Sequence, residues 1–308
     1  MELQFLGTGA GVPSKSRNVS SIALKLLDEL NEIWLFDCGE ATQHLILNTT
    51  LRPRKIKKIF ITHLHGDHIF GLPGFLSSRS FQGGDEKLTI YGPKGIQQFV
   101  ETSIRLSQSK LGYPLEFVEF TDDQLLFDEE RFSVSVGKLE HGIDSYGFRI
   151  VEKDQPGQLQ AQELFALGVP KGPLMGQLKR GEIVTLDNGT VIDGKQYITP
   201  DVKGRIIAIF GDTRKNQNEV KLAQDADVLV HEATFEKSEQ KLAYRYFHSS
   251  TVDAAQLAIR ANVKQLYLTH ISARYVGYQA KELEKEAQQL FPNTIVVRDY
   301  DVFDIPLK

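Results

Sequence analysis

Six consecutive residues of the chain, His-Leu-His-Gly-Asp-His, combine side chains that bind metal ions. They follow the apolar run Lys58–Thr62, which predicts a strand that ends at the first histidine. Because positions i and i+2 of an extended segment project to the same side, His63 and His65 can hold one ion. Asp67 and His68 follow a glycine turn and can reach a second ion. Imidazole and carboxylate ligands suit zinc, and two neighbouring ions can activate water together.

Three further metal-binding side chains stand where predicted strands end. His141, Asp212 and His270 each follow a short apolar run. Strand ends along one edge of a sheet are a natural place to assemble a site, so we expect these three to complete the ligand set. For any one of them alone, an ordinary buried or surface residue is the alternative interpretation.

Three other residues near these segments are not expected to bind a metal ion themselves. His44 lies in a predicted helix over residues 40–48 and is interpreted as a polar helix residue. Cys38 is expected to be a small buried residue. The preceding Asp37 is a candidate for supporting the site through hydrogen bonds to metal ligands.

Short apolar runs and segments of helical spacing alternate along most of the chain. Strands are expected at 3–6, 22–27, 33–36, 56–62, 88–91, 115–118, 132–139, 146–151, 205–210, 228–230 and 266–269. Helices are expected at 40–48, 69–80 (interrupted near Pro73), 94–108, 251–261 and 280–291. Ser250 and Asp253 resemble a capping box for the fourth of these helices. Strands with intervening helices suggest an α/β sandwich of two mixed sheets.

The composition changes after residue 151, because Gly and Pro are frequent in residues 156–181. Such density is typical of loops, with one short helix expected at 160–167. The apolar pattern typical of core strands begins again at the strand 205–210. We therefore interpret 152–202 as an insertion that projects from one domain made of 1–151 and 203–308.

Composition sets broad limits on compartment and partners. The chain has 308 residues, 41% hydrophobic and 25% charged, as expected of a soluble globular protein. Its single cysteine cannot form an intramolecular disulfide, which fits a reducing cytosol and predicts a cytoplasmic protein. No apolar run approaches the roughly 20 residues of a membrane span, and the N-terminus lacks signal-peptide order. A net charge of −4 argues weakly against a nucleic-acid-coated chain but leaves room for a local basic patch.

The histidine-rich motif resembles that of the metallo-β-lactamase superfamily, which hosts many reactions. Five narrower features resemble the ribonuclease Z family of tRNA 3′-processing endonucleases. They are 5–10 with the PxKxRN-like loop 13–18, the HEAT sequence at 231–234, His248, the segment 270–274, and the Gly-x-Pro-x-Gly-Pro sequence at 168–173. Ser250 stands where the family commonly has Thr, and the hydroxyl is kept. The resemblance covers nearly the whole chain.

This resemblance implies an αββα two-sheet sandwich with a protruding inserted arm, assembled as a homodimer. It also implies hydrolysis of one phosphodiester after the discriminator base, which removes the 3′ trailer of precursor tRNA. In the family, the arm of one subunit grips the tRNA body while the site of the other subunit cuts.

The resemblance implies two zinc ions per subunit and assigns a role to each site residue. One ion would be held by His63, His65, His141 and Asp212, and the other by Asp67, His68, Asp212 and His270. Asp67 would orient the attacking water and accept its proton. His248, kept protonated by Glu232, would donate a proton to the leaving oxygen. A surface ion pair is the alternative for those two residues, and His231 could either support the site or pack beneath it.

Substrate contacts are expected from basic residues of the core and of the insertion. Lys15, Arg17 and Arg274 are candidates for phosphate contacts near the cut. Candidates in the arm are Gly172, Pro173, Lys171, Lys179 and Arg180. Solvated surface charge is the alternative for all of them, because residues 153–199 hold as many acidic as basic side chains.

Two competing functions remain open at this point. A small-molecule hydrolase or phosphodiesterase on the same fold would share the metal ligands and would need no arm. A non-catalytic RNA-binding protein would not be expected to keep a complete ligand set. Fold alone does not choose between them.

Overall fold

Two seven-stranded mixed sheets form the framework of the chain, whose residues 1–307 are described by this computed structural model. The first sheet has the order β18-β1-β3-β4-β5-β6-β7, and its strands β4 to β7 run parallel. Its strands are β1 Glu2–Gly7, β3 Ser21–Leu26, β4 Glu32–Phe36, β5 Ile56–Phe60, β6 Leu88–Pro93, β7 Leu115–Phe120 and β18 Val302–Asp304.

The second sheet has the order β17-β15-β14-β13-β10-β9-β8. Its strands are β8 Gln124–Asp128, β9 Phe132–Leu139, β10 Ser145–Glu152, β13 Ile206–Phe210, β14 Val228–Glu232, β15 Gln265–Thr269 and β17 Thr294–Val296. The strands β13, β14, β15 and β17 are parallel, whereas β13 pairs with β10 in antiparallel fashion. A separate short pair joins β2 Gly9–Ala10 to β16 Ile271–Ser272.

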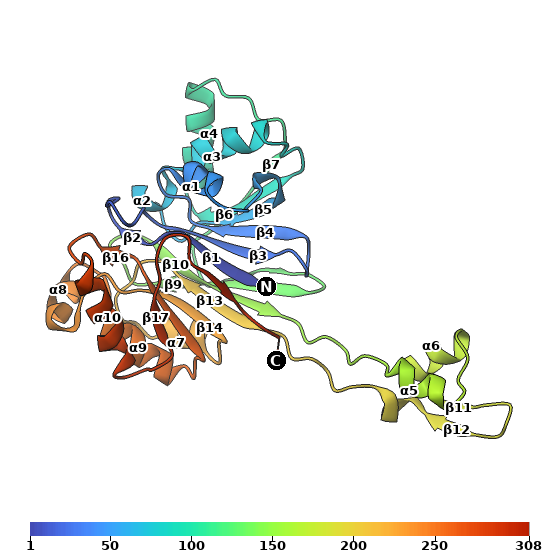
Figure 1. The fold of residues 1–308 in the computed structure, drawn as a ribbon. Coiled ribbons are helices and arrows are strands. Elements are labelled where there is room, and N and C mark those ends of the chain that lie inside the picture. Colours follow the sequence, from blue (N-terminus) through green and yellow to red (C-terminus); the bar gives the residue numbers. More distant parts are fainter. Residues whose placement is uncertain (308) are drawn as a thin grey trace. The chain divides into compact units, whose positions relative to one another are not determined.

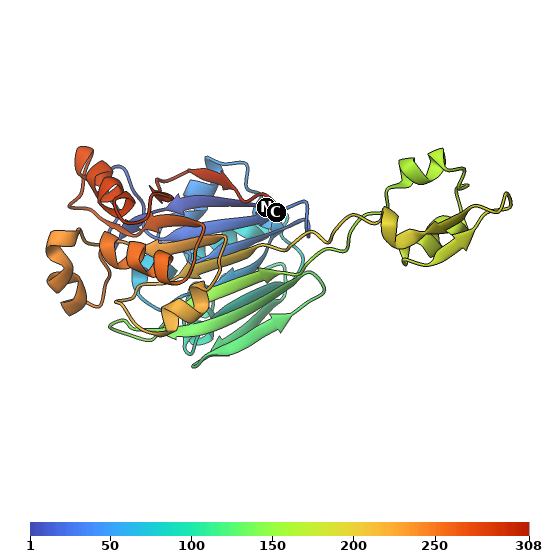
Figure 2. The same ribbon diagram turned by 90° about the horizontal axis from the view of Figure 1, so that it is seen from below.

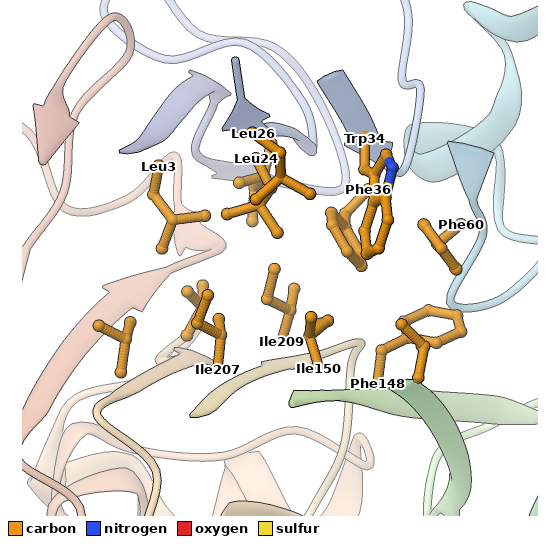
Figure 3. Close-up of a cluster of buried hydrophobic side chains, with 14 of the residues drawn as sticks. Leu3, Leu24, Leu26, Trp34, Phe36, Phe60, Phe148, Ile150, Ile207 and Ile209 are labelled. Carbon is orange, nitrogen blue, oxygen red and sulfur yellow. The ribbon is translucent and has the colours of Figure 1, made fainter. Parts of the chain in front are cut away.

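An aromatic and aliphatic core lies between the two sheets (Figure 3). The first sheet contributes Trp34, Phe36 and Phe60, and the second contributes Phe148. The Phe36 and Phe60 rings stack with centroids 4.8 Å apart, and Phe148 meets Phe60 edge to face at 5.3 Å. Rings in such arrangements stabilise a core by about 0.5–1.5 kcal/mol per pair beyond the burial of their area.

Helices cover the outer face of each sheet, which gives four layers in the order α, β, β, α (Figures 1 and 2). The helices over the first sheet are α1 Thr42–Leu47, α3 Leu72–Phe81 and α4 Ile96–Leu106, and those over the second are α7 Asn218–Ala223, α9 Thr251–Arg260 and α10 Tyr278–Gln288. The shorter elements are α2 Gly66–Ile69, α8 Gln240–Arg245, and the 3-10 turns η1 Pro53–Lys55 and η3 Lys237–Glu239. The expected αββα sandwich of the metallo-β-lactamase type is confirmed. Among residues 1–307, none of the helices combines the length and the apolar character needed to cross a bilayer.

Burial explains why the strands follow their sequence patterns. Along β9, Phe132, Val134 and Val136 are buried while the serines between them are half-exposed, as a strand with one covered face requires. Strand β13 is apolar throughout because Ile207 and Ile209 enter the core between the sheets while its alternate residues pack under the helices. The expected capping box is present at the start of α9.

Some expectations about elements were incomplete. The predicted helix 69–80 is two helices, and the break lies at Phe70–Gly71, before Pro73. Gly71 is needed there because a Cβ atom would lie 1.9 Å from the Gly39 carbonyl oxygen. The strands β8, β17 and β18 and the helices α7 and α8 were not predicted. All five are short, and their residues do not show a long hydrophobic period.

The inserted segment Glu152–Arg205 is a compact unit of its own. Contrary to the prediction of loops with one helix, it contains α5 Ala161–Ala166, α6 Pro173–Lys179, the hairpin β11 Ile183–Thr185 and β12 Val191–Asp193, and the turn η2 Gly194–Tyr197. Its small core consists of Leu164, Val169, Leu178, Val184, Leu186 and Ile192. The glycines and prolines obscured these elements because they stand at helix starts and turns, as Pro173 does in the first turn of α6.

Candidate metal centre

Seven His and Asp side chains from four separate segments meet where strands of both sheets end. His63 to His68 follow β5, His141 follows β9, Asp212 follows β13, and His270 follows β15. Their ligand atoms fall into two groups, each with all atoms within 4.8 Å of one another, and a third such group joins Asp212 and His270 to His248. The first two groups are His63, His65, His141 with Asp212, and Asp67, His68 with His270. Ligands commonly bind at the carboxyl ends of parallel strands, where loops converge.

The first group has the donor set and the spacing of a zinc site. His63 Nε2 lies 3.1 Å from His65 Nδ1, which lies 3.2 Å from His141 Nε2. Asp212 Oδ2 completes the group at 3.7 Å from His63 Nε2. Ligands placed tetrahedrally at 2.0–2.1 Å from zinc would be about 3.3 Å apart, so these nitrogens fit a shared ion.

The second group shares Asp212 with the first. His68 Nε2 lies 3.4 Å from Asp67 Oδ2 and 3.5 Å from Asp212 Oδ1. His270 Nε2 lies 3.3 Å from Asp67 Oδ2 and 3.2 Å from Asp212 Oδ2. The buried Nε2 atom of His68 makes no hydrogen bond within the described residues, which leaves it as a donor for an ion. Asp212 Oδ2 therefore faces ligands of both groups and Oδ1 faces His68, so this carboxylate joins the two groups.

The electrostatics of the cluster call for positive charge. Burial opposes ionisation of Asp212, yet the histidines around it, His270 first, hold the pKa of its carboxyl well below the ordinary value. Burial by itself would lower the pKa of His68, but Asp212 and Asp37 raise it well above the ordinary value. Burial and the neighbouring His68 lower the pKa of His63, which keeps that imidazole neutral. Buried carboxylates are stable when they pair with cations or coordinate metals, so metal ions fit this site.

Hydrogen bonds behind the cluster turn the Nε2 atoms of three histidines toward it. Asp37 accepts from His68 Nδ1 at 2.7 Å and from the Thr62 hydroxyl at 2.8 Å. The Thr62 hydroxyl lies 3.0 Å from His63 Nδ1, so it can accept from that ring. His141 Nδ1 donates to a backbone carbonyl at 2.8 Å. Such partners fix the tautomer of a metal-binding histidine, which supports the sequence-based interpretation of Asp37.

Thr234 plays the corresponding part for His270. Its hydroxyl donates to Glu232 Oε2 at 2.7 Å and lies 2.9 Å from His270 Nδ1, so it can accept from that ring. The sequence placed Thr234 in the HEAT motif without giving it a role. The signal that could have identified it is the hydroxyl two residues after a strand-end carboxylate.

A buried ion pair stands beside the metal cluster. His248 Nδ1 lies 2.8 Å from Glu232 Oε1, and Glu232 is 1% exposed. Burial would lower the pKa of His248, but the Glu232 charge and its hydrogen bond raise that pKa to about 9. His248 also lies 3.9 Å from Asp212 Oδ2, next to the predicted ligands. A protonated imidazole beside the cluster can supply a proton to a leaving oxygen.

Arg214 contributes to this arrangement, and sequence reasoning missed it. Its guanidinium carbon lies 4.2 Å from the ring centres of both Tyr244 and Phe247. The Phe247 carbonyl accepts the bond from His141, and the next residue is His248. Arg214 thus holds the segment that orients one candidate ligand and carries the candidate proton donor. Its partners lie about thirty positions away, so no local pattern marks it.

The other expected core residues are placed as follows. Lys15 and Arg274 are exposed, and Arg274 also pairs with Glu239 at 3.0 Å. Arg17 is 7% exposed and donates to the Thr8 hydroxyl at 2.7 Å and to a carbonyl at 2.5 Å. That placement does not suit the phosphate contact expected of Arg17, because its guanidinium is committed to the loop behind the site.

Besides His248, two histidines lie outside both ligand groups. His44 is exposed on α1, as its interpretation as a polar helix residue anticipated. His231 is buried against Phe210 and contacts Glu219 at 3.2 Å, so it packs beneath the site. Cys38 is fully buried, and burial raises the pKa of its thiol to about 12.

The predicted RNA-contacting residues of the insertion all belong to its compact unit. Gly172, Pro173, Lys171, Lys179 and Arg180 are exposed there. Arg180 pairs with Glu182 at 2.6 Å, and Lys171 lies 5.8 Å from the Phe165 ring centre. The insertion therefore presents basic side chains on its surface.

Known proteins resemble the chain over its whole length. Ribonuclease Z of Latilactobacillus sakei is 61% identical over 306 residues, covering 99% of this chain and 98% of that protein. Ribonuclease Z of Ligilactobacillus salivarius is 63% identical, covering 99% of this chain and 97% of that protein. These relatives include the inserted segment within the matched length.

Solved structures agree with the fold. The short form of human tRNase Z matches with a TM-score of 0.72 and 30% identity, covering 99% of this chain and 100% of that one. The metallo-β-lactamase fold protein YhfI from Bacillus subtilis matches with a TM-score of 0.67, 18% identity and 98% coverage of both chains, which shows the fold alone. A family profile described as Anti-Pycsar protein Apyc1 matches residues 1–148.

Proposed function

The chain belongs to the ribonuclease Z family of endoribonucleases, and from this membership we propose that it removes the 3′ trailer of precursor tRNA. The bond cut is the phosphodiester after the discriminator base. The observation that carries the proposal is the pair of ligand groups joined by Asp212, with the ion pair of His248 and Glu232 beside them.

Two zinc ions per subunit are the proposed cofactors. His63, His65, His141 and Asp212 would hold one ion, and Asp67, His68, Asp212 and His270 would hold the other. When bound, such ions lower the pKa of a water molecule and stabilise negative charge on phosphate oxygens. The His-rich donor set and the unpartnered Nε2 atom of His68 support this proposal.

Asp67 is the proposed residue for positioning the attacking water and receiving its proton. Its Oδ2 atom accepts from the Gly11 backbone N–H at 2.9 Å, which fixes the carboxylate beside both ligand groups. Burial would raise the pKa of Asp67, but the hydrogen bond from His270 and the charge of His68 hold it far below its ordinary value. The carboxylate therefore stays ionised and always presents a hydrogen-bond acceptor.

His248 is the proposed proton donor for the leaving 3′ oxygen. With its Nδ1 atom bound to Glu232, the Nε2 atom is the nitrogen that can meet a substrate oxygen. The side chain is 18% exposed, so substrate can reach it. A pKa of about 9 keeps the ring protonated at neutral pH.

The compact unit Glu152–Arg205 is the proposed tRNA-binding arm, inserted into a core made of the rest of the chain. Its Lys171, Lys179 and Arg180 would contact phosphates, and the exposed Gly172–Pro173 turn would approach the RNA backbone. In the core, Lys15 and Arg274 are the proposed phosphate contacts. We also propose a cytoplasmic homodimer in which the arm of one subunit serves the site of its partner.

Mapping the cut on a 3′-extended precursor tRNA tests the proposal. We expect a single cut after the discriminator base, abolished by a chelator and restored by zinc. Asp67→Ala should lose at least about 100-fold in kcat, the lower end expected for a catalytic acid–base group. His44→Ala is the matched control, because it removes a histidine outside both ligand groups and should cut normally.

A second substrate separates the proposal from its main alternative. Replacing residues 153–203 by a short linker should abolish cutting of tRNA and spare hydrolysis of bis-p-nitrophenyl phosphate. If the intact protein hydrolyses that diester but leaves precursor tRNA uncut, the proposed tRNA-processing activity is wrong. The protein is then a small-molecule phosphodiesterase.

A further inference from the structure

A cavity of about 460 Å³ lies behind the loop that begins at the candidate catalytic centre. Its wall consists of Ser16, Arg17, Tyr275, Gly277, Tyr278, Ala280, Lys281 and Arg298. None of the seven predicted metal ligands belongs to it, and its volume lies within the usual range for small-ligand pockets.

The wall of this cavity carries no carboxylate and three cations, of which Arg17 is committed to bonds with Thr8 and Val297. Lys281 and Arg298 are exposed, and neither makes a side-chain ion pair within the described residues. The neighbouring carboxylates have other partners: Asp299 accepts from Thr8 and Asn18, and Asp301 accepts from a backbone N–H. Glu239 accepts from the Tyr275 hydroxyl, and Glu282 pairs with Lys285. A site with this charge selects an anion.

Two tyrosines give the cavity a second chemical property. Tyr275 is 8% exposed, and its hydroxyl accepts from the Glu236 N–H at 3.0 Å, which fixes its ring in the wall. Tyr278 is 68% exposed at the start of α10. Aromatic rings next to Lys and Arg are the combination that binds single-stranded nucleic acid, because bases stack on the rings while phosphates meet the cations.

Two of the segments that line the cavity, 16–17 and 275–281, follow closely after residues of the candidate catalytic centre. Gly11, whose N–H binds Asp67, lies five residues before Ser16, and His270 lies five residues before Tyr275. The short pairing of β2 with β16 ties the two segments together (Figure 1). Five residues span at most about 18 Å, so the cavity lies within a few nucleotides of the scissile phosphate.

We propose that this cavity binds a nucleotide of the 3′ trailer of the RNA substrate. The inference rests on the proposed function. On the upstream side of the cut, only the discriminator base is unpaired before the acceptor-stem duplex begins, and that base must lie at the metal cluster itself. A pocket a few nucleotides away that stacks a free base must therefore receive the single-stranded downstream side. Lys281 and Arg298 contact the trailer phosphates, and Tyr278 stacks on a base.

The test compares precursor tRNAs that carry trailers of one and six nucleotides. The double variant Lys281→Glu/Arg298→Glu should lower kcat/KM for the six-nucleotide trailer by at least about 10-fold and leave the one-nucleotide trailer unchanged. Its salt dependence on the long trailer should weaken by about 1.4 in log–log slope, the value for two phosphate contacts to a single strand. Tyr278→Ala should lower the same kcat/KM by at least about 5-fold, with recovery in Tyr278→Phe.

The matched control is Arg105→Glu/Lys110→Glu, which reverses one exposed Arg of α4 and one exposed Lys in the loop after it. It should cut both substrates like the unmodified protein. Equal losses on both trailers in the Lys281/Arg298 variant, or no loss on either, would overturn the proposal.

A binding experiment separates failure of the proposed pocket from failure of the proposed function. Fluorescence anisotropy of a labelled six-nucleotide RNA with the full, metal-loaded chain reports the pocket without any cleavage. If unmodified protein cuts no precursor tRNA, the proposed function fails, and a pocket that binds the oligonucleotide only while Lys281 and Arg298 are present is still an RNA site. Oligonucleotide binding that is the same in unmodified protein and the double variant removes the pocket even if tRNA is cut.

Discussion

Replacing Glu232 by Gln should disable the proton donor and leave the metal cluster in place. Glu232 contacts His248 at 2.8 Å and raises its pKa to about 9, against an ordinary value of 6.5. At pH 8, a histidine with a pKa of about 9 is about 90% protonated and one with a pKa of 6.5 about 3%, a ratio of about 30. The loss of kcat expected at that pH is therefore on the order of 30-fold.

The assay is kcat for precursor tRNA between about pH 6 and 10. Because the raised pKa means that His248 is protonated below it, activity should fall as pH rises through that pKa. In Glu232→Gln the falling limb should move to lower pH, while activity near pH 6 stays closest to that of the unmodified protein.

A substrate that needs no proton donor provides the control. Bis-p-nitrophenyl phosphate releases a stable phenolate, so its hydrolysis should change little in Glu232→Gln. Glu232 also accepts from the Thr213 and Ser249 N–H groups, so thermal melting must confirm that the variant remains folded. An unshifted pH limb, or equal losses on both substrates in a folded variant, would refute the role assigned to the pair.

Three further predictions follow from other contacts. Asp37→Ala removes the acceptor of His68 Nδ1 and should weaken metal binding by about 10–100-fold, measured by zinc titration against a chromophoric chelator. Arg214→Lys keeps the charge but loses the stacked guanidinium plane, so kcat should fall with KM unchanged; a changed KM alone would contradict a positioning role. Phe60→Ala empties the centre of the core between the sheets and should lower the free energy of unfolding by about 3–5 kcal/mol in urea titrations, and a loss below 1 kcal/mol would contradict its central place.

The framework of the site could be read from local sequence because its parts are local. The spacing of His63, His65, Asp67 and His68 is set within six residues, and strands ending in His or Asp are visible as apolar runs. The fold class followed from the alternation of strands and helices. The sequence suggested a supporting role for Asp37 but not its partner. The structure shows that Asp37 accepts a hydrogen bond from His68.

Other features depend on partners that are distant in sequence. Arg214 owes its place to two rings about thirty residues away, and Arg17 to a carbonyl at the far end of the chain. A basic residue in a loop has the same local pattern whether it binds phosphate or closes a buried hydrogen bond. The insertion was expected to be mostly loop because its helices are short and its core holds few side chains.

The point at which the insertion enters the chain has a consequence for folding. Strands β10 and β13 are paired neighbours, with Val151 opposite Ile206, and everything between them is inserted. Closing a loop of about 50 residues costs about 2 kcal/mol more than closing a four-residue turn, which delays pairing of the strand that leads to Asp212. The inserted unit offsets this delay if it folds first, because its bridge between Gln155 and Val202 brings the two strand ends together. Folding of the inserted unit thus lowers the entropic cost of pairing β10 with β13. Replacing the insertion by a short turn should let the core fold at least as fast.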